Sequence, residues 1–567
     1  MAFEQPRAVH VARRAEEVCG VLALVETAAA QGRWCVGFVA HEAAPAFDAA
    51  LDVKPDARTP LAWFAEFDAG HAVPAALPDS NAPFRMDTPV GDTPYNRYRN
   101  CIETIRADIR DGRFYQVNFT SRLVAAFEGD ALTLHRALQA EQPNGYHAFI
   151  DTGDGALSSL SPELFFALHG GHVTTQPMKG TAPRGDSAAE DDRIAWALTH
   201  SDKERAENLM IVDLLRNDLS RIAKPNSVEV AALFALQPLP SVWQMTSTIH
   251  AELREGLGLT DVFRALFPCG SVTGAPKVEA MRAIRDLEAA PRGVYCGAIG
   301  FVAPAESGQV RACFNVGIRS LWIESGRVTF GVGGGITFDS TVEGEWAEMH
   351  YKARFAVRAA KPFELLETLK LAQGEFALRE RHLARMEKSA RHFRFAFDRA
   401  AVTAALEALV YAHTDGAWRV RLLSDRNGNV RSEIAPLGAL ASGLRCTLAA
   451  SAIVSADEFL RHKTTRRESY EYHAPAGQAA FDTLLFNERG ELTEFTRANL
   501  ALEVGGKIFT PPVECGLLNG TWRDDCVARG EWTERVLTRE DLGKASRIGW
   551  VNSVRGWVDV TLDMERA

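Results

Sequence analysis

Lys203-Glu-Arg-Ala-Glu-Asn-Leu-Met-Ile-Val-Asp-Leu-Leu-Arg-Asn-Asp218 is the stretch that most constrains the fold of this chain. Just ahead of it, Ser201 and Glu204 have the spacing of a capping box, which begins a helix. Glu204 and Glu207 are three residues apart, so they share a helix face near the positive end of the helix dipole. The stretch therefore predicts a helix that presents two carboxylates on one side.

A second pair of carboxylates, Glu345 and Glu348, has the same spacing within a helix predicted over residues 342–360. If the two helices face each other, four carboxylates converge, and a hard cation such as Mg²⁺ makes such a cluster tolerable. Each pair alone also has a simpler interpretation, with Glu204 only a helix cap and Glu345 only a solvated surface residue.

Three other segments favour a site for an anion. Tyr295 precedes a strand of small residues, Arg319 ends another strand, and Gly331-Val-Gly-Gly-Gly-Ile offers backbone amides that could bind a carboxylate. The alternative for these glycines is a bulge or a tight sheet contact. Neither this run nor Gly270–Lys277 has the spacing of a dinucleotide site or a P-loop.

Composition excludes several classes of protein. A chain of 567 residues is too long to fold around a single hydrophobic core. Its net charge of −10 and the lack of a run of basic residues argue against a nucleic-acid binder. The nine cysteines are scattered without a C-x-x-C pair, which disfavours a disulfide framework and a zinc site. No apolar run reaches the roughly 18 residues of a membrane span. We therefore expect a cytoplasmic enzyme that acts on small-molecule substrates.

The chain divides at Lys361-Pro362, because proline disfavours a helical residue before it. Residues 1–360 form the first predicted domain, in which 1–90 is a variable part read as strands joined by long loops such as 72–83. Residues 361–567 form the second. Its elements are predicted as a strand at 363–371, a helix at 381–393, and strands at 418–423, 480–487 and 499–503. The pattern indicates a two-part chain of mixed α/β and α+β character.

Five strings in the first domain carry a family resemblance. They are Ser161-Pro-Glu-Leu, Gln176-Pro-Met-Lys-Gly-Thr-Ala-Pro-Arg184, Lys203–Asp218, Gly270-Ser-Val-Thr-Gly-Ala-Pro-Lys277 and Glu345-Trp-Ala-Glu. In this order they resemble the chorismate-binding enzymes, the anthranilate, isochorismate and aminodeoxychorismate synthases. The resemblance implies two large antiparallel sheets flanked by helices.

The resemblance also implies roles for individual residues. Glu207 and Glu348 would bind Mg²⁺ directly, Glu204 and Glu345 would act through water, and the ion would hold the ring carboxylate of chorismate. The enolpyruvyl carboxylate would be held by Tyr295, Arg319, Ser271 and the amides of Gly333 and Gly335.

Lys179 indicates the reaction within this family. Anthranilate synthases resemble this chain but carry alanine there, whereas aminodeoxychorismate synthases (component I) carry lysine. In the lysine type the amine would add at C2 of the ring as the C4 hydroxyl leaves, and ammonia would then enter at C4 and expel it. Glu163 matches the general acid/base of the family. Gln244 stands where several relatives have histidine, so an amide would orient the ring. No cysteine lies in a glutaminase nucleophile turn, so a separate glutamine amidotransferase subunit, or free ammonium, would supply ammonia.

The second domain resembles the fold-type IV pyridoxal-phosphate enzymes, which include branched-chain and D-amino-acid aminotransferases and aminodeoxychorismate lyase. The resemblance rests on Arg381–Ala390, His462-Lys-Thr, Leu492–Leu500 and Gly516–Arg523. It implies that Lys463 bonds to pyridoxal 5′-phosphate, that Glu494 pairs with the pyridine nitrogen, and that the phosphate is held by Arg385, Thr496 and Thr521. Read alone, Lys463 lies in a basic stretch that an exposed surface would also explain.

Together the two halves predict synthesis of 4-aminobenzoate, a folate precursor. The first half would aminate chorismate and the second would eliminate pyruvate from 4-amino-4-deoxychorismate. The alternatives are a transaminase or a non-catalytic module as the second half, and an anthranilate synthase-like first half. The resemblance also allows a homodimer through the second domain. Oligomeric state, channelling, the identity of the glutaminase and feedback control are not readable from the sequence.

Overall fold

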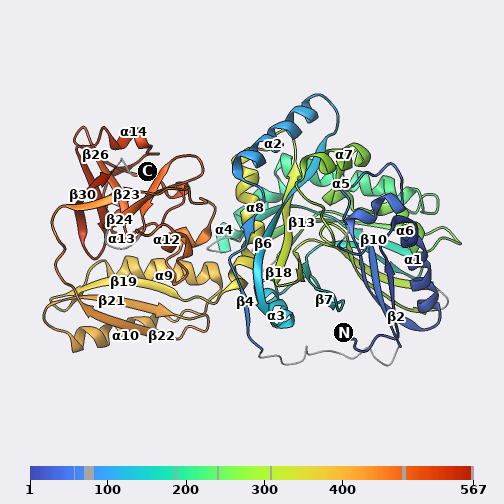
Figure 1. Ribbon diagram of the computed structural model, residues 1–567, viewed down its shortest axis with the longest axis horizontal. Helices are drawn as coiled ribbons and strands as arrows, with labels where there is room; N and C mark the ends of the chain where they lie inside the picture. The colour runs from blue at the N-terminus through green and yellow to red at the C-terminus, as the bar shows by residue number, and fades with distance from the viewer. Residues whose placement is uncertain are drawn as a thin grey trace. The chain divides into compact units, whose positions relative to one another are not determined.

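The computed structural model describes residues 1–56, 58–68, 82–184, 188–238, 242–306, 309–475 and 480–563. The chain forms two compact units, residues 1–361 and 362–567 (Figure 1). Among the described residues, no helix is both long and apolar enough to cross a membrane.

The first unit contains two sheets whose strand pairings in the described part of the chain are all antiparallel. The first has the order β1 (Ala8–Ala12), β3 (Ala62–Asp68), β2 (Arg33–Val39), β15 (Ala298–Glu306), β16 (Gln309–Val316), β9 (Leu164–His169), β10 (His172–Gln176), β13 (Val242–Glu252) and β11 (Met178–Pro183), with β12 (Glu229–Pro238) paired to β13. The second has the order β14 (Gly274–Ala275), β6 (Gln116–Gly129), β18 (Arg327–Ile336), β17 (Ser320–Glu324), β8 (Ala156–Ser161) and β7 (Tyr146–Asp151), with β4 (Phe84–Met86) and β5 (Val90–Gly91) paired to β6. This confirms the predicted antiparallel double sheet.

Helices cover these sheets. They are α1 (Ala15–Ala30), α2 (Tyr95–Arg110), α3 (Ala131–Glu141), α4 (Ala188–Thr199), α5 (Asp202–Ser220), α6 (Leu259–Leu266), α7 (Lys277–Leu287) and α8 (Val342–Ala360), with the short 3-10 helices η1 (His41–Ala46) and η3 (Gly270–Val272). Helix α8 packs on β18, and α5 packs on β11 and β13. The helix bounds of α8 match the prediction over 342–360.

The beginning of the first unit differs from its prediction as strands and loops. Helix α1 occupies residues 15–30 and buries Val18, Leu22 and Val25 against the sheet. These apolar residues have helical spacing, but the surrounding alanines blur the polar face and hide the period. Most of the predicted loop 72–83 lies outside the described residues.

Side-chain caps fix where the two site helices begin. The Ser201 hydroxyl accepts a hydrogen bond from the Glu204 amide at 3.3 Å, and the Thr341 hydroxyl accepts one from Gly344 at 3.2 Å. A buried ion pair of 2.9 Å between Lys277 and Asp218 then joins the start of α7 to the end of α5. Two of the sequence strings are therefore held together by a direct charge contact.

The second unit contains a small sheet and a larger one. The small sheet has the order β20 (Glu375–Phe376), β19 (Leu365–Ala372), β21 (Ala417–Ser424) and β22 (Val430–Pro436), and it is covered by α9 (Arg379–Phe393) and α10 (Arg399–Ala412). The larger has the order β25 (Leu492–Phe495), β24 (Asp482–Phe486), β23 (Leu444–Leu448), β30 (Gly556–Asp563), β29 (Arg547–Asn552), β26 (Asn499–Val504), β27 (Lys507–Thr510) and β28 (Trp532–Glu534). Because β25 also pairs with β26, the strands from β25 to β26 close into a ring.

Short helices complete the second unit. They are α11 (Glu458–Arg461), α12 (Glu468–Tyr472), α13 (Thr521–Ala528), α14 (Arg539–Leu542) and the 3-10 helix η4 (Val513–Cys515). The observed helix at 379–393 and strands at 417–424, 482–486 and 499–504 agree with the sequence prediction to within two residues at each end. The chain therefore has the predicted two-part fold.

Candidate active sites

The pKa values of Glu204 and Glu207, the two carboxylates on α5, depend on the charge of Glu348 on α8 and on the charge of one lysine. Burial raises the pKa of Glu204 and of Glu207, and the negative charge of Glu348 raises both further. The positive charge of Lys179 acts in the opposite direction on each. The two predicted carboxylate pairs and the predicted lysine therefore belong to one electrostatic cluster.

On α8, the two glutamates have different partners. Glu345 is buried, accepts a hydrogen bond of 2.7 Å from the Ser340 hydroxyl, and has a pKa raised to about 7 by burial and by the charge of Glu348. Glu348 is half exposed, and its carboxylate lies 2.7 Å from the ammonium of Lys352. Burial acts to raise the pKa of Glu348, but Lys352 lowers it overall. The sequence interpretation missed Lys352. Its position four residues after Glu348 on the same helix could have indicated an ion pair between the two.

The cluster fits a divalent cation by its chemistry. In the part of the chain that the structure describes, no three His, Cys, Asp or Glu side chains are arranged to hold a metal ion, and Lys352 and Ser340 contact the α8 carboxylates. Carboxylate oxygens are nevertheless the ligands that Mg²⁺ prefers, and three of the four have raised pKa values because their charges are buried and repel. A cation would relieve that repulsion.

Glu163, the predicted general acid/base, is a buried carboxyl group with a raised pKa. It is 4% exposed, and burial raises its pKa to about 7, against the opposing effects of a hydrogen bond from Ser271 and the charge of Lys179. Its Oε1 atom is buried without a hydrogen-bond partner. Near neutral pH both protonation states of Glu163 are accessible, which suits a group that donates and accepts a proton.

Strand β11 carries Lys179 and is held from two sides. The Asn208 side chain on α5 donates to the carbonyl of Lys179 at 3.3 Å, and Gln244 on β13 donates to the carbonyl of Gly180 at 2.9 Å. Gln244 also accepts a hydrogen bond from the Thr181 hydroxyl at 2.9 Å. Both ends of this amide thus hold β11, and the role expected for Gln244 in orienting the ring stays a prediction.

The residues predicted for the second carboxylate lie around β18. The ring of Tyr295 covers Gly331, where a methyl group would come within 2.2 Å of the ring. Arg319 is held by a hydrogen bond to the carbonyl of Lys352 and lies 5.4 Å from the centre of the Phe355 ring. Burial lowers the pKa of Arg319.

Ser271 and the remaining glycines complete this group. Ser271 is buried in η3, where its hydroxyl lies 3.2 Å from the Sγ atom of Cys269 and acts to lower the pKa of Glu163. At Gly333 an added Cβ would lie 2.2 Å from the carbonyl of Phe119, which is the tight sheet contact of the alternative interpretation. At Gly335 it would instead meet the side chains of Gln116 and Lys179. Gln116 was not singled out, because its position at the site comes from the pairing of β6 with β18 and not from spacing.

The second unit places Lys463 in a partly buried, charged environment. Burial lowers the pKa of Lys463 to about 7, and the cations Arg467 and Arg385 lower it further, against the carboxylates of Glu367 and Glu494. Glu494 is 4% exposed and accepts hydrogen bonds from Tyr470 at 2.7 Å, the Leu518 amide at 2.9 Å and Asn499 at 3.0 Å. Burial raises the pKa of Glu494 to about 7. A neutral amine at neutral pH is the form that bonds to an aldehyde.

Arg385 and Thr521 belong to one buried network. Arg385 binds both oxygens of Glu367, at 2.8 and 2.6 Å, and donates to the carbonyl of Asn519 at 2.9 Å. His382 bridges Glu367 and the Thr521 hydroxyl, at 2.6 and 3.1 Å. Thr521 is the first residue of α13, so a guanidinium and a helix start lie together, as phosphate binding requires.

Thr496, which is also predicted as a phosphate ligand, has contacts of its own in this structure. Its hydroxyl donates to Asp482 at 2.5 Å, and its carbonyl accepts from Arg467 at 2.6 Å. These contacts do not join it to Arg385 and Thr521. Glu367 and Tyr470 were not predicted, although a lone carboxylate within the apolar strand 365–372 is a signal that could have indicated Glu367.

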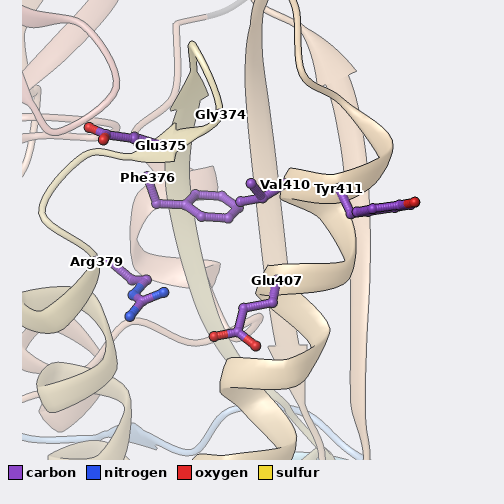
Figure 2. A pocket seen from close by; sticks show the side chains of 7 residues that line it. All are labelled: Gly374, Glu375, Phe376, Arg379, Glu407, Val410 and Tyr411. Atoms are coloured by element: carbon purple, nitrogen blue, oxygen red, sulfur yellow. The ribbon is translucent and has the colours of Figure 1, made fainter.

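A surface pocket of about 430 Å³ lies elsewhere on the second unit (Figure 2). It is lined by Gly374, Glu375, Phe376, Arg379, Glu407, Val410 and Tyr411. None of the predicted site residues lines it, so we assign it no part in the chemistry.

The fold and its two sites define a two-part enzyme with a carboxylate-lined site in an antiparallel double sheet and a partly buried lysine in the second unit. The chain belongs to the chorismate binding enzyme family, which matches residues 71–358. Residues 364–562 match the amino-transferase class IV family, which implies pyridoxal 5′-phosphate as cofactor.

Individual relatives agree with the first assignment. Aminodeoxychorismate synthase component 1 of Salmonella typhimurium is 42% identical over 251 residues, which are 44% of this chain and 54% of that protein. Anthranilate synthase component 1 of Methanothermobacter thermautotrophicus is 33% identical over 318 residues, which are 54% of this chain and 66% of that protein. The crystal structure of anthranilate synthase component I from Streptococcus pneumoniae matches with a TM-score of 0.54 and 25% identity, over 63% of this chain and 91% of that chain. The chain spans about half the length of the Salmonella relative.

Proposed function

We propose that this chain makes 4-aminobenzoate in two steps, using residues 1–360 as an aminodeoxychorismate synthase component I and residues 361–567 as an aminodeoxychorismate lyase. The observation that carries the proposal is the amine of Lys179 among the carboxylates of Glu163, Glu204 and Glu207. An amine in a site for chorismate supplies a nucleophile that an anthranilate-forming site does not require.

In the first site, Mg²⁺ would be held by Glu207 and Glu348 directly and by Glu204 and Glu345 through water. Its charge would offset that of the carboxylates and hold the ring carboxylate of chorismate. The enolpyruvyl carboxylate would be bound by Tyr295, Arg319, Ser271 and the amides of Gly333 and Gly335. Chorismate would then lie between the two groups of residues with its ring facing Lys179.

Lys179 and Glu163 would carry out the substitution. The Lys179 amine adds at C2 as the C4–O bond breaks and the ring double bonds shift. Protonated Glu163 gives its proton to the departing hydroxyl, which leaves as water, and its pKa of about 7 makes that proton available at neutral pH. Ammonia then bonds to C4, the double bonds shift back, and the Lys179 amine is released.

The ammonia would come from a separate glutamine amidotransferase subunit or from free ammonium. Amide hydrolysis by a cysteine needs a reactive thiolate. Burial raises the pKa of Cys269 and of Cys296, the cysteines nearest in sequence to Ser271 and Tyr295, to about 12. These thiols are therefore inert, which supports an external source.

In the second site, Lys463 would bond to pyridoxal 5′-phosphate, Glu494 would contact its pyridine nitrogen, and Arg385, Thr521 and Thr496 would hold its phosphate. The cofactor supplies an electron sink when bound. Lys463, whose amine has a pKa of about 7 in the cofactor-free chain, would be the group that takes the ring proton whose loss makes the product aromatic. Tyr470 and Asn499 keep the Glu494 carboxylate in place throughout.

There are three alternatives, and two of them are each favoured by one observation. The match to amino-transferase class IV favours an amino-acid transaminase in the second half, and a non-catalytic module of that fold is the further option. The 33% identity to an anthranilate synthase favours an anthranilate-forming first half, against which Lys179 argues.

Product analysis separates these functions. The purified chain receives chorismate, ammonium and Mg²⁺, with and without pyridoxal phosphate. We expect 4-aminobenzoate and pyruvate with the cofactor and 4-amino-4-deoxychorismate without it. Anthranilate as the product would refute the synthase assignment. Accumulation of aminodeoxychorismate despite bound cofactor, together with amino transfer from a D- or branched-chain amino acid, would establish the transaminase instead.

A further inference from the structure

Three buried side chains in the second unit form a continuous chain of hydrogen bonds. Nδ1 of His382 lies 2.6 Å from a carboxylate oxygen of Glu367, and Nε2 of His382 lies 3.1 Å from the hydroxyl oxygen of Thr521. Glu367 and His382 are each 1% exposed and Thr521 is 4% exposed, so bulk water does not compete for these bonds. The protonation state of the imidazole ring therefore decides where the hydroxyl hydrogen of Thr521 points.

The neighbouring charges fix that protonation state. Burial acts to raise the pKa of Glu367, but Arg385 and His382 lower it to about 2, so Glu367 is a carboxylate that only accepts hydrogen bonds. Nδ1 of His382 is therefore the nitrogen that carries the hydrogen. Burial lowers the pKa of His382, against the opposing charge of Glu367, so the ring is neutral at neutral pH. Nε2 is then an acceptor, and the Thr521 hydroxyl donates to it.

The Thr521 hydroxyl in this state cannot donate to a phosphate ester. Above pH 7 such an ester is mostly a dianion, with a second pKa of about 6, and its oxygens only accept hydrogen bonds. The single hydrogen of the hydroxyl already bonds to His382. If His382 takes up a proton, Nε2 becomes a donor to the hydroxyl oxygen, and the hydroxyl hydrogen becomes available to another acceptor.

The charges that face His382 also favour a proton there once an anion binds. Glu367 on β19 and Arg385 on α9 pair with each other at 2.8 and 2.6 Å, so together they offer an anion no net charge. The charge of Lys463 opposes a proton on His382. The other charged groups of α9 and α13 near this network pair among themselves or with β28, namely Arg381 with Asp524 and Asp525, and Arg523 with Glu534. A proton on His382 would supply the missing positive charge, and Glu367 would stabilise it.

We propose that His382 takes up one proton from solvent when a phosphate ester binds at Arg385 and Thr521, and that this proton turns the Thr521 hydroxyl toward the phosphate. The hydrogen bond from the Thr521 hydroxyl to Nε2 breaks. A bond from Nε2–H to the hydroxyl oxygen and a bond from the hydroxyl to the phosphate take its place. His382 is thus a positioning residue that acts through Thr521. The inference rests on the proposed placement of the cofactor phosphate at Arg385 and Thr521.

Calorimetry with two unreactive ligands tests the proton uptake. Pyridoxine 5′-phosphate and pyridoxine lack the aldehyde that bonds to Lys463, and they differ only in the phosphate group. The full chain, freed of cofactor, is titrated with each ligand at pH 7.5 in buffers of different ionisation enthalpy, which counts the protons taken up on binding. We expect about one proton more with pyridoxine 5′-phosphate than with pyridoxine.

His382→Gln should abolish this difference, because the amide accepts a hydrogen bond from Thr521 but takes up no proton. Its affinity for pyridoxine 5′-phosphate should fall by about tenfold or more, the usual effect of losing a hydrogen bond to a charged group, and its affinity for pyridoxine should stay within about twofold. If His382→Gln fails to fold, Thr521→Val decides. A protonated Nε2 would there be buried without an acceptor, so the extra proton should again be lost.

His473→Gln is the matched control. His473 lies in the same unit and also uses both ring nitrogens, with Nδ1 2.8 Å from the carbonyl of Ser469 and Nε2 3.2 Å from the hydroxyl of Ser451. This variant should keep the extra proton and both affinities.

Two results would overturn the proposal. One is an extra proton that persists in His382→Gln or Thr521→Val. The other is an equal loss of affinity for both ligands in His382→Gln, which a merely structural role would give. An unaltered chain that binds pyridoxine 5′-phosphate no more tightly than pyridoxine would refute the proposed cofactor site itself, and the inference with it.

Discussion

The ammonium group of Lys352 lies 2.7 Å from the carbonyl oxygen of Gly333 and so joins helix α8 to strand β18. The same ammonium pairs with Glu348 at 2.7 Å. Lys352 therefore occupies the position from which a cation would bind Glu348, and it contacts the strand whose amides are proposed to bind substrate. The charge of one lysine links the two parts of the site.

Lys352→Met should lower the Mg²⁺ concentration needed for half-maximal amination. Removing the ammonium frees the Glu348 carboxylate, so the ion no longer competes with a built-in cation. Titration of activity with Mg²⁺ measures this, with Lys224→Met as control, because Lys224 is half exposed and its partner at 3.1 Å is Glu252, which is not one of the site carboxylates. A higher Mg²⁺ requirement in Lys352→Met would show that Lys352 assists the ion.

Gly335→Ala should abolish most amination without unfolding the first unit. The added methyl group would lie 1.8 Å from Gln116 Nε2 and 3.0 Å from Lys179 Nζ, so both side chains must move. We expect kcat for aminodeoxychorismate to fall by about 100-fold, since small displacements of reacting groups have effects of that order.

Gly20→Ala is the control for this substitution, because a Cβ at Gly20 in α1 would meet no atom within 4 Å. It should leave both activity and thermal unfolding close to those of the unaltered chain. Circular dichroism of Gly335→Ala checks that the fold persists. A Gly335→Ala chain with full activity would mean that the space over this glycine is not used.

Sequence patterns indicated most of the elements that carry the first site, because its motifs are local. Glu204 and Glu207 on one helix and Glu345 and Glu348 on another follow from periodicity, and both helices have the predicted positions. Gln116 and Gly335 meet only through the pairing of β6 with β18, a contact between distant segments that no local spacing reveals. Helix α1 was missed for a different reason, since its alanine-rich surface weakens the amphipathic signal.

The second site shows the same limit. The basic surroundings of Lys463 allowed an exposed stretch as one interpretation. In the structure Lys463 is partly buried and within the electrostatic influence of Glu494, some thirty residues further along the chain. Tyr470 and Glu367 became visible only through hydrogen bonds that tertiary packing creates. Thr496 was placed with the phosphate by its motif, whereas its hydroxyl contacts Asp482.

Binding of pyridoxal phosphate to the cofactor-free chain should depend on pH around 7. Burial and neighbouring arginines lower the pKa of Lys463 to about 7, so the amine is protonated and unreactive below that pH and neutral above it. The rate at which visible cofactor absorbance develops should rise by about tenfold per pH unit below pH 7 and level off above it. Stopped-flow absorbance measures the rate, and Lys463→Ala should give no signal. A rate that keeps rising through pH 9 would indicate an ordinary lysine.

Glu494→Gln should separate the two halves of the reaction. The substitution keeps the shape of a side chain that Tyr470, Leu518 and Asn499 hold, but removes the charge proposed to pair with the pyridine nitrogen. We expect 4-aminobenzoate formation to fall by roughly 10- to 100-fold, the effect of losing a charged hydrogen bond, while cofactor remains attached to Lys463. Aminodeoxychorismate should accumulate at an unchanged rate, because the first unit is untouched.

Glu491→Gln is the matched control, because the Glu491 carboxylate binds Arg489 and Asn487 in the same unit, and this variant should keep both rates. Unchanged 4-aminobenzoate formation in Glu494→Gln would remove Glu494 from the cofactor site.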